Sequence, residues 1–324
     1  MPMRNVAGLF VSLFVVSGLI AGSPAQGADA PPAWAYPVTP PGPKPPPDDG
    51  ILRHVPNSEA TFTVIQSRDP FFSPDWHPDD HPPMPEIVAI GRKPGALACG
   101  FCHRADGSGG PENARVAGLP AAYLAQQMAD FISGARKTSA PERLAPKYMI
   151  ITAKAVDDQE VEAATAYFAA IKPRATIRVV EAETVPKTKL EGERLAVTVD
   201  PGTEAIGQRI IEVPEDEEGF ALRDGRTRFV ACVPPGSLLK GQALVASGDG
   251  KTGSCGMCHG SDLKGLGPIP AIAGRSPSYI VRQLYDFKTG ARAGAWSPLM
   301  KPVVEKLSLD DMISIAAYAA SLSP

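Results

Sequence analysis

The chain has 324 residues, a formal net charge of −3, 35 prolines and 31 glycines. Its basic residues form no cluster, so the sequence gives no reason to expect a nucleic-acid partner. The length allows two or three domains, and the proline and glycine content indicates small helical units joined by much irregular chain.

Residues 1–27 are typical of a secretory signal peptide. Arg4 gives a positive start, residues 6–20 form an apolar run too short for a comfortable membrane span, and small residues up to Gly27 offer a cleavage site. An uncleaved anchor is the alternative. No other stretch is apolar enough to cross a bilayer. We therefore predict export to a bacterial periplasm, with no integral membrane span after signal cleavage.

Residues 28–85 form a proline-rich arm that also contains aromatic residues such as Trp34 and Trp76. Such a composition cannot bury a core of its own, so we predict an irregular arm. Two roles stay open: the arm wraps the helical domains, or it binds a partner.

The motif Cys-x-x-Cys-His occurs twice. The copies are Cys99-Gly100-Phe101-Cys102-His103 and Cys255-Gly256-Met257-Cys258-His259. Two thiols at this spacing can form thioether bonds to the vinyl groups of a haem, and the histidine then binds the iron. A zinc site would not need a histidine after each pair, and a redox dithiol would need an early βαβ unit. We predict two covalently attached haem c groups.

The duplication extends beyond the motifs. At the same offset of 156 residues the pairs are Asp106/Asp262, Gly109/Gly265, Ala117/Ala273, Tyr123/Tyr279, Gln127/Gln283, Asp130/Asp286, Phe131/Phe287 and Arg136/Arg292. One domain type is therefore used twice, and we expect the two copies at residues 86–172 and 236–324.

The matched segment predicts a helix in each copy. In the first copy Pro120 opens it and Gly134 closes it. In the second copy Ser276 can cap the helix, Pro277 occupies the first helical position, and Gly290 supplies the stop.

One face of this helix carries Tyr123, Gln127 and Phe131, which recur at i, i+4 and i+8. The tyrosine and phenylalanine are predicted to be core residues that pack on the haem. For Gln127 and Gln283 three positions stay open: a haem edge, the other domain, or a solvated edge of the core.

A last helix ends each copy. Ser308 and Asp311 resemble a capping box in the second copy, and Asp157 and Glu160 take these roles in the first. The offset here is 151 residues, so the first copy has five extra residues before its last helix.

A six-coordinate haem iron needs a second axial ligand, and a methionine thioether suits it and raises the reduction potential. Met300 lies just before the last helix, in a proline-flanked segment that we predict to be a loop. Its counterpart at the offset of 151 is Met149. We predict His103 and Met149 as iron ligands in the first domain, and His259 and Met300 in the second.

Other residues of the first half could replace Met149 as the ligand. Met128 pairs with Leu284 and lies within a predicted helix, while Met84 has no partner in the repeat. His77 and His81 would give a bis-histidine haem.

Gly110-Pro111 and Gly267-Pro268 follow the two motifs at similar distances. They could present the backbone carbonyl that holds the second ring nitrogen of the iron-bound histidine, or form plain turns.

Residues 173–235 are predicted to be a β-rich connector, because the runs 177–180 and 209–213 are rich in β-branched residues. The acidic run 215–218 is most simply a solvated turn, with partner docking as the alternative. Cys232 lies in an apolar run and is expected to be a buried strand residue rather than a reactive or ligating thiol.

The first copy lacks a clear opening helix. Residues 237–245 form one in the second copy, whereas Pro82, Pro83 and Pro85 interrupt the corresponding stretch of the first. We expect the arm to replace that packing.

These motifs make the chain resemble the diheme cytochromes c of the c-four kind, over residues 86–172 and 236–324. The resemblance implies a mainly α fold, with two cytochrome c-type helical haem domains. Here a small β-rich insert joins them and a proline-rich irregular arm precedes them. It also implies His/Met ligation at both irons and haem edges close enough to exchange electrons.

The resemblance further implies a periplasmic carrier between electron donor and acceptor proteins. One alternative is a haem subunit of a dehydrogenase or oxidase complex, and another version of it docks to a membrane-bound oxidase or dehydrogenase. Another is an enzyme, such as a diheme peroxidase or a sulfur-compound dehydrogenase. An enzyme would need an open coordination position or an unusual ligand, whereas both copies offer a methionine at equivalent positions.

Overall fold

The structure is a computed structural model that describes Met1 and residues 30–38, 49–191, 194–197 and 201–324. Apart from Met1, the predicted signal peptide lies outside the described residues. In the described part of the chain, each helix is too short or too polar to cross a bilayer.

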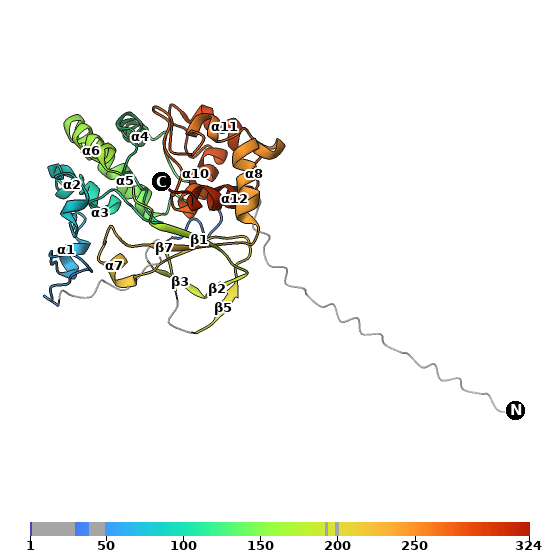
Figure 1. Cartoon of the computed structure of the whole chain (residues 1–324), viewed down its shortest axis with the longest axis horizontal. Helices are drawn as coiled ribbons and strands as arrows, with labels where there is room; N and C mark the ends of the chain where they lie inside the picture. Colours follow the sequence, from blue (N-terminus) through green and yellow to red (C-terminus); the bar gives the residue numbers. More distant parts are fainter. Residues whose placement is uncertain (2–29, 39–48, 192–193, 198–200) are drawn as a thin grey trace. The chain divides into compact units, whose positions relative to one another are not determined.

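Two sets of helices correspond to the two repeats (Figure 1). The first set is α2 (Glu86–Ala89), α3 (Cys99–His103), α4 (Ala121–Ser133), α5 (Leu144–Ala155) and α6 (Asp158–Ala170). The second set is α8 (Ser237–Ser247), α9 (Gly256–His259), α10 (Pro277–Thr289), α11 (Ser297–Val304) and α12 (Leu309–Ser321), with a 3-10 turn η2 (Gly248–Gly250) after α8. Thus α3, α4, α5 and α6 match α9, α10, α11 and α12.

The helix boundaries follow the predicted signals. Gly134 and Gly290 end α4 and α10 in the left-handed conformation, with φ of 73° and 80°, which glycine adopts without steric cost. The Ser276 hydroxyl caps α10 by accepting from the N–H of Tyr279. The two predicted capping boxes are both present, at the starts of α6 and α12.

The prediction that Met149 and Met300 lie in loops is wrong. Both are on helices, α5 and α11. Pro146 and Pro298 fall in the first turns of these helices, where the backbone N–H has no intrahelical partner, so a proline there does not prevent a helix.

Each repeat buries its own core. In the second, α12 packs on α8 and α10 around Leu244, Val281 and Ile313. The approach of α8 to α12 requires a glycine, because a Cβ on Gly241 would lie 2.0 Å from the carbonyl oxygen of Ser314. In the first repeat α6 packs on α4 and on the four-residue α2. The absence of a long opening helix there is confirmed.

The predicted β-rich connector is confirmed. Its strands are β1 (Ile177–Glu181), β2 (Thr184–Pro186), β3 (Thr188–Glu191), β4 (Arg194–Val197), β5 (Thr203–Ala205), β6 (Ile211–Pro214) and β7 (Phe229–Val233). One sheet has the order β1-β7-β6, with β1 parallel and β6 antiparallel to β7, and the antiparallel pairs β2-β5 and β3-β4 complete the insert.

Two details of the connector differ from expectation. Asp216 does not lie in a plain turn but caps the short helix α7 (Glu217–Ala221), accepting from the N–H of Gly219 at 3.0 Å. Cys232 lies on β7 as expected, but it is half-buried because it alternates with the buried Ala231 and Val233.

The arm is more regular than predicted. It contains α1 (Val64–Arg68), which starts with a capping box, and the 3-10 turn η1 (Pro78–Asp80). Tyr36 is buried in the core of the second repeat, and Trp76 packs with Leu222 of the connector. The arm therefore packs on the rest of the protein, which agrees with the first of the two predicted roles, wrapping the helical domains.

The fold is mainly α, with two cytochrome c-type helical domains and a small β insert, as predicted.

Candidate haem sites

Short helices carry both Cys-x-x-Cys-His motifs. In α3 and α9 the helical turn brings the two cysteines and the following histidine to one side, since residues three and four apart are neighbours on a helix. All four motif cysteines are free thiols, which haem attachment requires.

The two histidines share one hydrogen-bond arrangement. The Nδ1 of His103 lies 2.8 Å from the carbonyl oxygen of Ala114, and that of His259 lies 2.8 Å from the carbonyl oxygen of Pro270. Burial lowers the pKa of both histidines, which favours the neutral ring. With Nδ1 as the donor, Nε2 keeps its lone pair for a metal.

The backbone carbonyls that hold the histidines come from residues other than the predicted ones. Of the two alternatives for the Gly110-Pro111 and Gly267-Pro268 pairs, the one in which they supply these carbonyls is wrong. In both repeats the acceptor lies eleven residues after the histidine, but every residue has a backbone carbonyl, so no sequence signal pointed to this one.

The first motif opens into a cavity of about 190 Å³, lined by Cys99, Cys102, His103 and Met149. Apolar side chains from several elements form most of its wall: Ile87, Leu97, Val116, Leu124, Phe131 and Phe168. A mostly apolar cavity with two thiols, a histidine and a thioether in its wall fits a covalently attached haem.

Of the alternative ligands, Met128 also lines this cavity, whereas Met84 packs on the core cluster of the first repeat. The two candidate histidines of the arm, His77 and His81, are engaged elsewhere. The Nε2 of His77 lies 3.1 Å from Asp224, and that of His81 lies 3.2 Å from Asp75. Among these alternatives, Met128 is therefore the residue that can compete with Met149 as the second axial ligand.

In the second repeat, one motif cysteine and the predicted methionine pack on one core cluster. Met300, on α11, is half-buried and packs on the same core cluster as Cys255. Cys258 is exposed, so this motif reaches the surface of the protein.

The second repeat also completes the first cavity. Residues from α10 line it, namely Tyr279, Arg282, Gln283 and Asp286, together with Arg275 just before this helix. Both repeats therefore contribute to the wall of the first site.

A crossed hydrogen-bond network joins the repeats. Arg136 donates to Gln127 of its own repeat at 2.8 Å and to Gln283 of the other at 3.3 Å. Arg292 donates to Gln283 at 2.9 Å and to Gln127 at 2.7 Å. Both glutamines therefore face the other domain, one of the three positions predicted for them.

The tyrosines on the same face belong to this network. Arg292 donates to the hydroxyl of Tyr123 at 2.9 Å, and Arg136 to that of Tyr279 at 3.1 Å. Burial raises the pKa of Tyr123, but the nearby guanidinium groups outweigh this effect and lower it to about 8. The role of Arg136 and Arg292 was not predicted from the sequence. Their repetition at the offset of 156 was the available signal.

Backbone contacts reinforce the pairing. The N–H of Lys137 donates to the carbonyl of Ala291, and that of Ala293 to Ala135, both at 2.8 Å. The Asp286 carboxylate accepts from the N–H of Ser139 at 2.8 Å. The segments that follow α4 and α10 thus bind each other in a pseudo-symmetric way.

Comparison with known proteins agrees with this geometry. Residues 88–172 match the cytochrome c family. Cytochrome c-554(548) of Halomonas halodenitrificans is 40% identical over 78 residues, which cover 24% of this chain and 94% of the relative. Cytochrome c4 of Azotobacter vinelandii is 26% identical over 231 residues, covering 70% and 85%. A Stutzerimonas stutzeri protein named thiosulfate dehydrogenase electron acceptor is 26% identical over 235 residues, covering 72% and 82%.

Two equivalent helical domains with one haem-attachment motif each define a diheme electron-transfer protein. The chain belongs to the cytochrome c family and is of its diheme c4 type. It carries two covalently attached haem c groups and transfers electrons, as the paired motifs predicted.

Proposed function

We propose a specific set of haem-binding residues. The iron ligands are His103 and Met149 in the first domain and His259 and Met300 in the second, and the attachment residues are Cys99, Cys102, Cys255 and Cys258. The observation that supports this most is the equal arrangement of the two histidines, which leaves both Nε2 atoms available. His/Met ligation fills both axial positions, as a carrier requires.

The charge-transfer band between methionine sulfur and ferric iron tests the ligands. In the oxidised holoprotein, Met149→Leu and Met300→Leu each remove about half of the band, because each haem contributes one Fe–S bond. Met128→Leu is the matched control, since Met128 lines the first cavity as well. Loss of the band in Met128→Leu, with Met149→Leu unchanged, would reverse the assignment.

We further propose that the protein works in the periplasm and accepts electrons from a dehydrogenase of a reduced sulfur compound. The similarity to a protein named thiosulfate dehydrogenase electron acceptor, over 82% of its length, supports this role. Cys232, the thiol outside the motifs, lies on β7 beside an apolar cluster of the connector. Its position favours a carrier over an enzyme with a cysteine-ligated haem.

The donor is tested by mixing the oxidised holoprotein with thiosulfate, with and without a purified thiosulfate dehydrogenase, while the absorbance of the reduced haems is followed. We expect reduction by two electrons per molecule only when the enzyme is present. Reduction by thiosulfate alone would make the chain itself the dehydrogenase, and no reduction in either mixture would reject thiosulfate oxidation as the source.

A further inference from the structure

We infer that this protein exchanges electrons with partner proteins through the haem-attachment face of the second repeat, while its own arm and connector close the equivalent face of the first. The inference rests on the proposed attachment residues, and it assigns the docking surface that the carrier role leaves open. It follows from a comparison of the two motifs and their surroundings, position by position.

The first motif is covered from two sides. The guanidinium of Arg223, from the connector, lies 3.6 Å from the ring centroid of Phe101 and donates to the Phe101 carbonyl at 2.9 Å. From the arm, Ser73 approaches so closely that a Cβ on Gly100 would lie 2.4 Å from its hydroxyl oxygen. Arg223 also donates to the carbonyl of Ser67, so arm and connector hold each other over the motif.

The loop after the first motif is buried in the same way. Arg104 is 3% exposed, and its guanidinium lies over the ring of Phe220 in α7 at 5.3 Å. Asp106 is 8% exposed and forms an ion pair with Arg174 of the connector at 3.2 Å.

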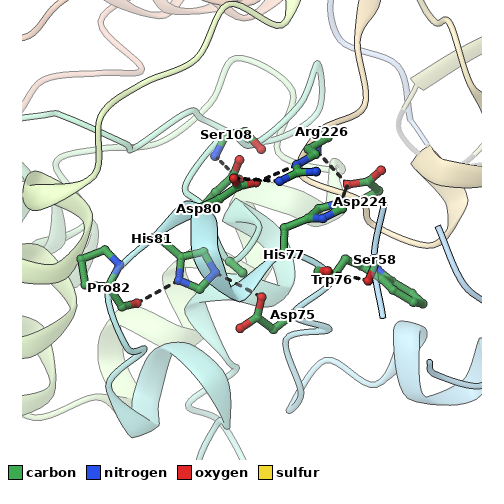
Figure 2. A network of polar contacts seen from close by, with 12 residues as sticks. Ser58, Asp75, Trp76, His77, Asp80, His81, Pro82, Ser108, Asp224 and Arg226 are labelled. Atoms are coloured by element: carbon green, nitrogen blue, oxygen red, sulfur yellow. Dashed lines mark hydrogen bonds and ion pairs between the residues drawn. The ribbon is translucent and has the colours of Figure 1, made fainter. Parts of the chain in front are cut away.

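Polar contacts fasten the arm to the connector at this place (Figure 2). Asp80 accepts from Arg226 at 2.8 Å, and His77 contacts Asp224 at 3.1 Å. The cover over the first motif is therefore an anchored part of the fold.

The second motif has no such cover. Met257, the counterpart of Phe101, is 74% exposed, and Cys258 is exposed whereas Cys102 is half-buried. In the following loop Leu266 is 60% exposed, although its counterpart Gly110 is buried. The thioether edge of the second haem is thus the one that a protein can approach.

The exposed apolar side chains of this repeat identify the face. Met257 lies between the two attachment cysteines, Leu266 lies in the loop that leads to Pro270, and Leu299, 66% exposed, precedes Met300. Each belongs to a segment that supplies a site residue. We call these three side chains the apolar rim.

Charge indicates the kind of partner. Lys264 and Lys301 lie two residues from Leu266 and Leu299, and both are exposed. The ammonium group of Lys301 donates to the backbone carbonyl of Lys288, an uncharged acceptor, whereas that of Lys264 donates to an oxygen of Pro324. The surface fits a redox protein whose cofactor edge is apolar and is surrounded by carboxylates.

A competing surface exists on the first repeat. Leu144, Tyr148 and Ile151 are exposed at i, i+4 and i+7, so they form an apolar stripe on α5 beside Met149. Tyr148 is the counterpart of Leu299 at the offset of 151. In the first repeat the α5 segment is exposed, but the haem-attachment motif and the loop after it are covered. In the second repeat the motif, the loop after it and the segment before Met300 all carry exposed side chains.

Oxidised plastocyanin, a small copper protein with an acidic surface, serves as the probe acceptor. The second-order rate constant for oxidation of the reduced holoprotein is measured by stopped flow. We expect Met257→Glu and Lys264→Glu to lower it about 10-fold or more, and high salt to lower it in the parent protein. Leu239→Glu is the matched control, since Leu239 is 75% exposed but lies on α8.

A second readout is binding without electron transfer. Cadmium-substituted plastocyanin is titrated into the reduced holoprotein, and the methyl NMR signals of Met257 and Ile151 are followed. We expect the Met257 signal to shift and the Ile151 signal to stay. A rate lowered by Ile151→Glu and not by Met257→Glu, or a shift at Ile151 alone, would overturn the inference. Because the probe needs no sulfur compound, the outcome is independent of the proposed donor.

Discussion

Arg292 of the second repeat donates a hydrogen bond of 2.7 Å to Gln127 of the first, and this bond is mirrored by that from Arg136 to Gln283. Arg292 is 8% exposed, and its partners in this network are neutral oxygens. The two domains are therefore joined by charge-assisted hydrogen bonds from a buried arginine.

Replacing this arginine tests how much the network contributes. Arg292→Ala leaves Tyr123 without its donor and Gln127 with only the bond from Arg136, and we expect the free energy of unfolding to fall by about 2–4 kcal/mol. Denaturant unfolding of the holoprotein measures it. Arg228→Ala is the control, because the Arg228 side chain is 62% exposed and its ion pair with Glu215 is worth less than about 1 kcal/mol. Equal losses in the two variants would contradict a role in joining the domains.

Asp311 links three elements of the second repeat and should make its stability depend on pH. Burial raises its pKa, but hydrogen bonds from Lys240, Lys251 and Ser308 outweigh this and hold the pKa well below the usual range. The ionised form is therefore favoured by folding. Its contribution is present above the pKa of a free carboxyl, about 3.9, and is lost as the pH falls towards the lower folded value.

The matching variant is Asp311→Asn. We expect a loss of about 2 kcal/mol near neutral pH and a flatter dependence of the unfolding free energy on pH below about 4. Asp310→Asn removes a neighbouring carboxylate that is 46% exposed, and its effect should stay below about 1 kcal/mol. A parallel pH profile for Asp311→Asn and the parent protein would refute the assignment.

His81 gives the arm the opposite pH dependence. Both ring nitrogens face acceptors, the Asp75 carboxylate at 3.2 Å and the Pro82 carbonyl at 2.9 Å (Figure 2). Burial lowers its pKa, but Asp75, Pro82 and the charge of Asp106 together raise it above the usual value. Because the charged ring is favoured in the folded state, its contribution is complete below about pH 6.5 and is lost as the pH rises through the higher folded pKa.

Hydrogen exchange of residues 75–82, corrected for its intrinsic dependence on pH, measures this effect. Protection should decrease as the pH rises above about 6.5 in the parent protein and be low throughout in His81→Phe. Residues 309–321 of α12 provide the internal reference. If protection of the arm stayed constant over this range, His81 would not be the group responsible.

Trp76 ties the arm to the connector. It is 2% exposed, packs with Val55 and Leu222, and donates from Nε1 to the Leu222 carbonyl at 2.8 Å. Trp76→Ala should cost about 3–5 kcal/mol, and Trp76→Phe about 1–2 kcal/mol for the lost hydrogen bond. Thermal unfolding of the holoprotein, with Trp34→Phe as control, provides the measurement. No difference between Trp76→Phe and the control would show that the hydrogen bond is immaterial.

Local sequence signals predicted a large part of the fold. The haem motifs, the ends of α4 and α10 and both capping boxes depend on residues a few positions apart, and the sequence shows them directly. The repeat offsets selected Met149 and Met300, although not their helical setting. The β-branched runs likewise located β1 and β6, since strand propensity is read within a short window.

Long-range contacts account for what the sequence did not reveal. Arg223 covers Phe101 from 122 residues further along the chain, and no periodicity encodes such a pair. The carbonyls of Ala114 and Pro270 are backbone groups, which every residue possesses, so composition cannot single them out. The cover of the first motif and the openness of the second therefore became visible only in three dimensions.

The contact between Ser73 and Gly100 has a consequence for the maturation of the protein. With the arm in place, no atom larger than a hydrogen fits on the Gly100 Cα, and Arg223 closes the neighbouring side. An attachment enzyme that must grasp this peptide therefore has to act before the arm packs. The exposed second motif imposes no such order, so the unequal wrapping of two similar domains restricts the timing of haem attachment in the first domain alone.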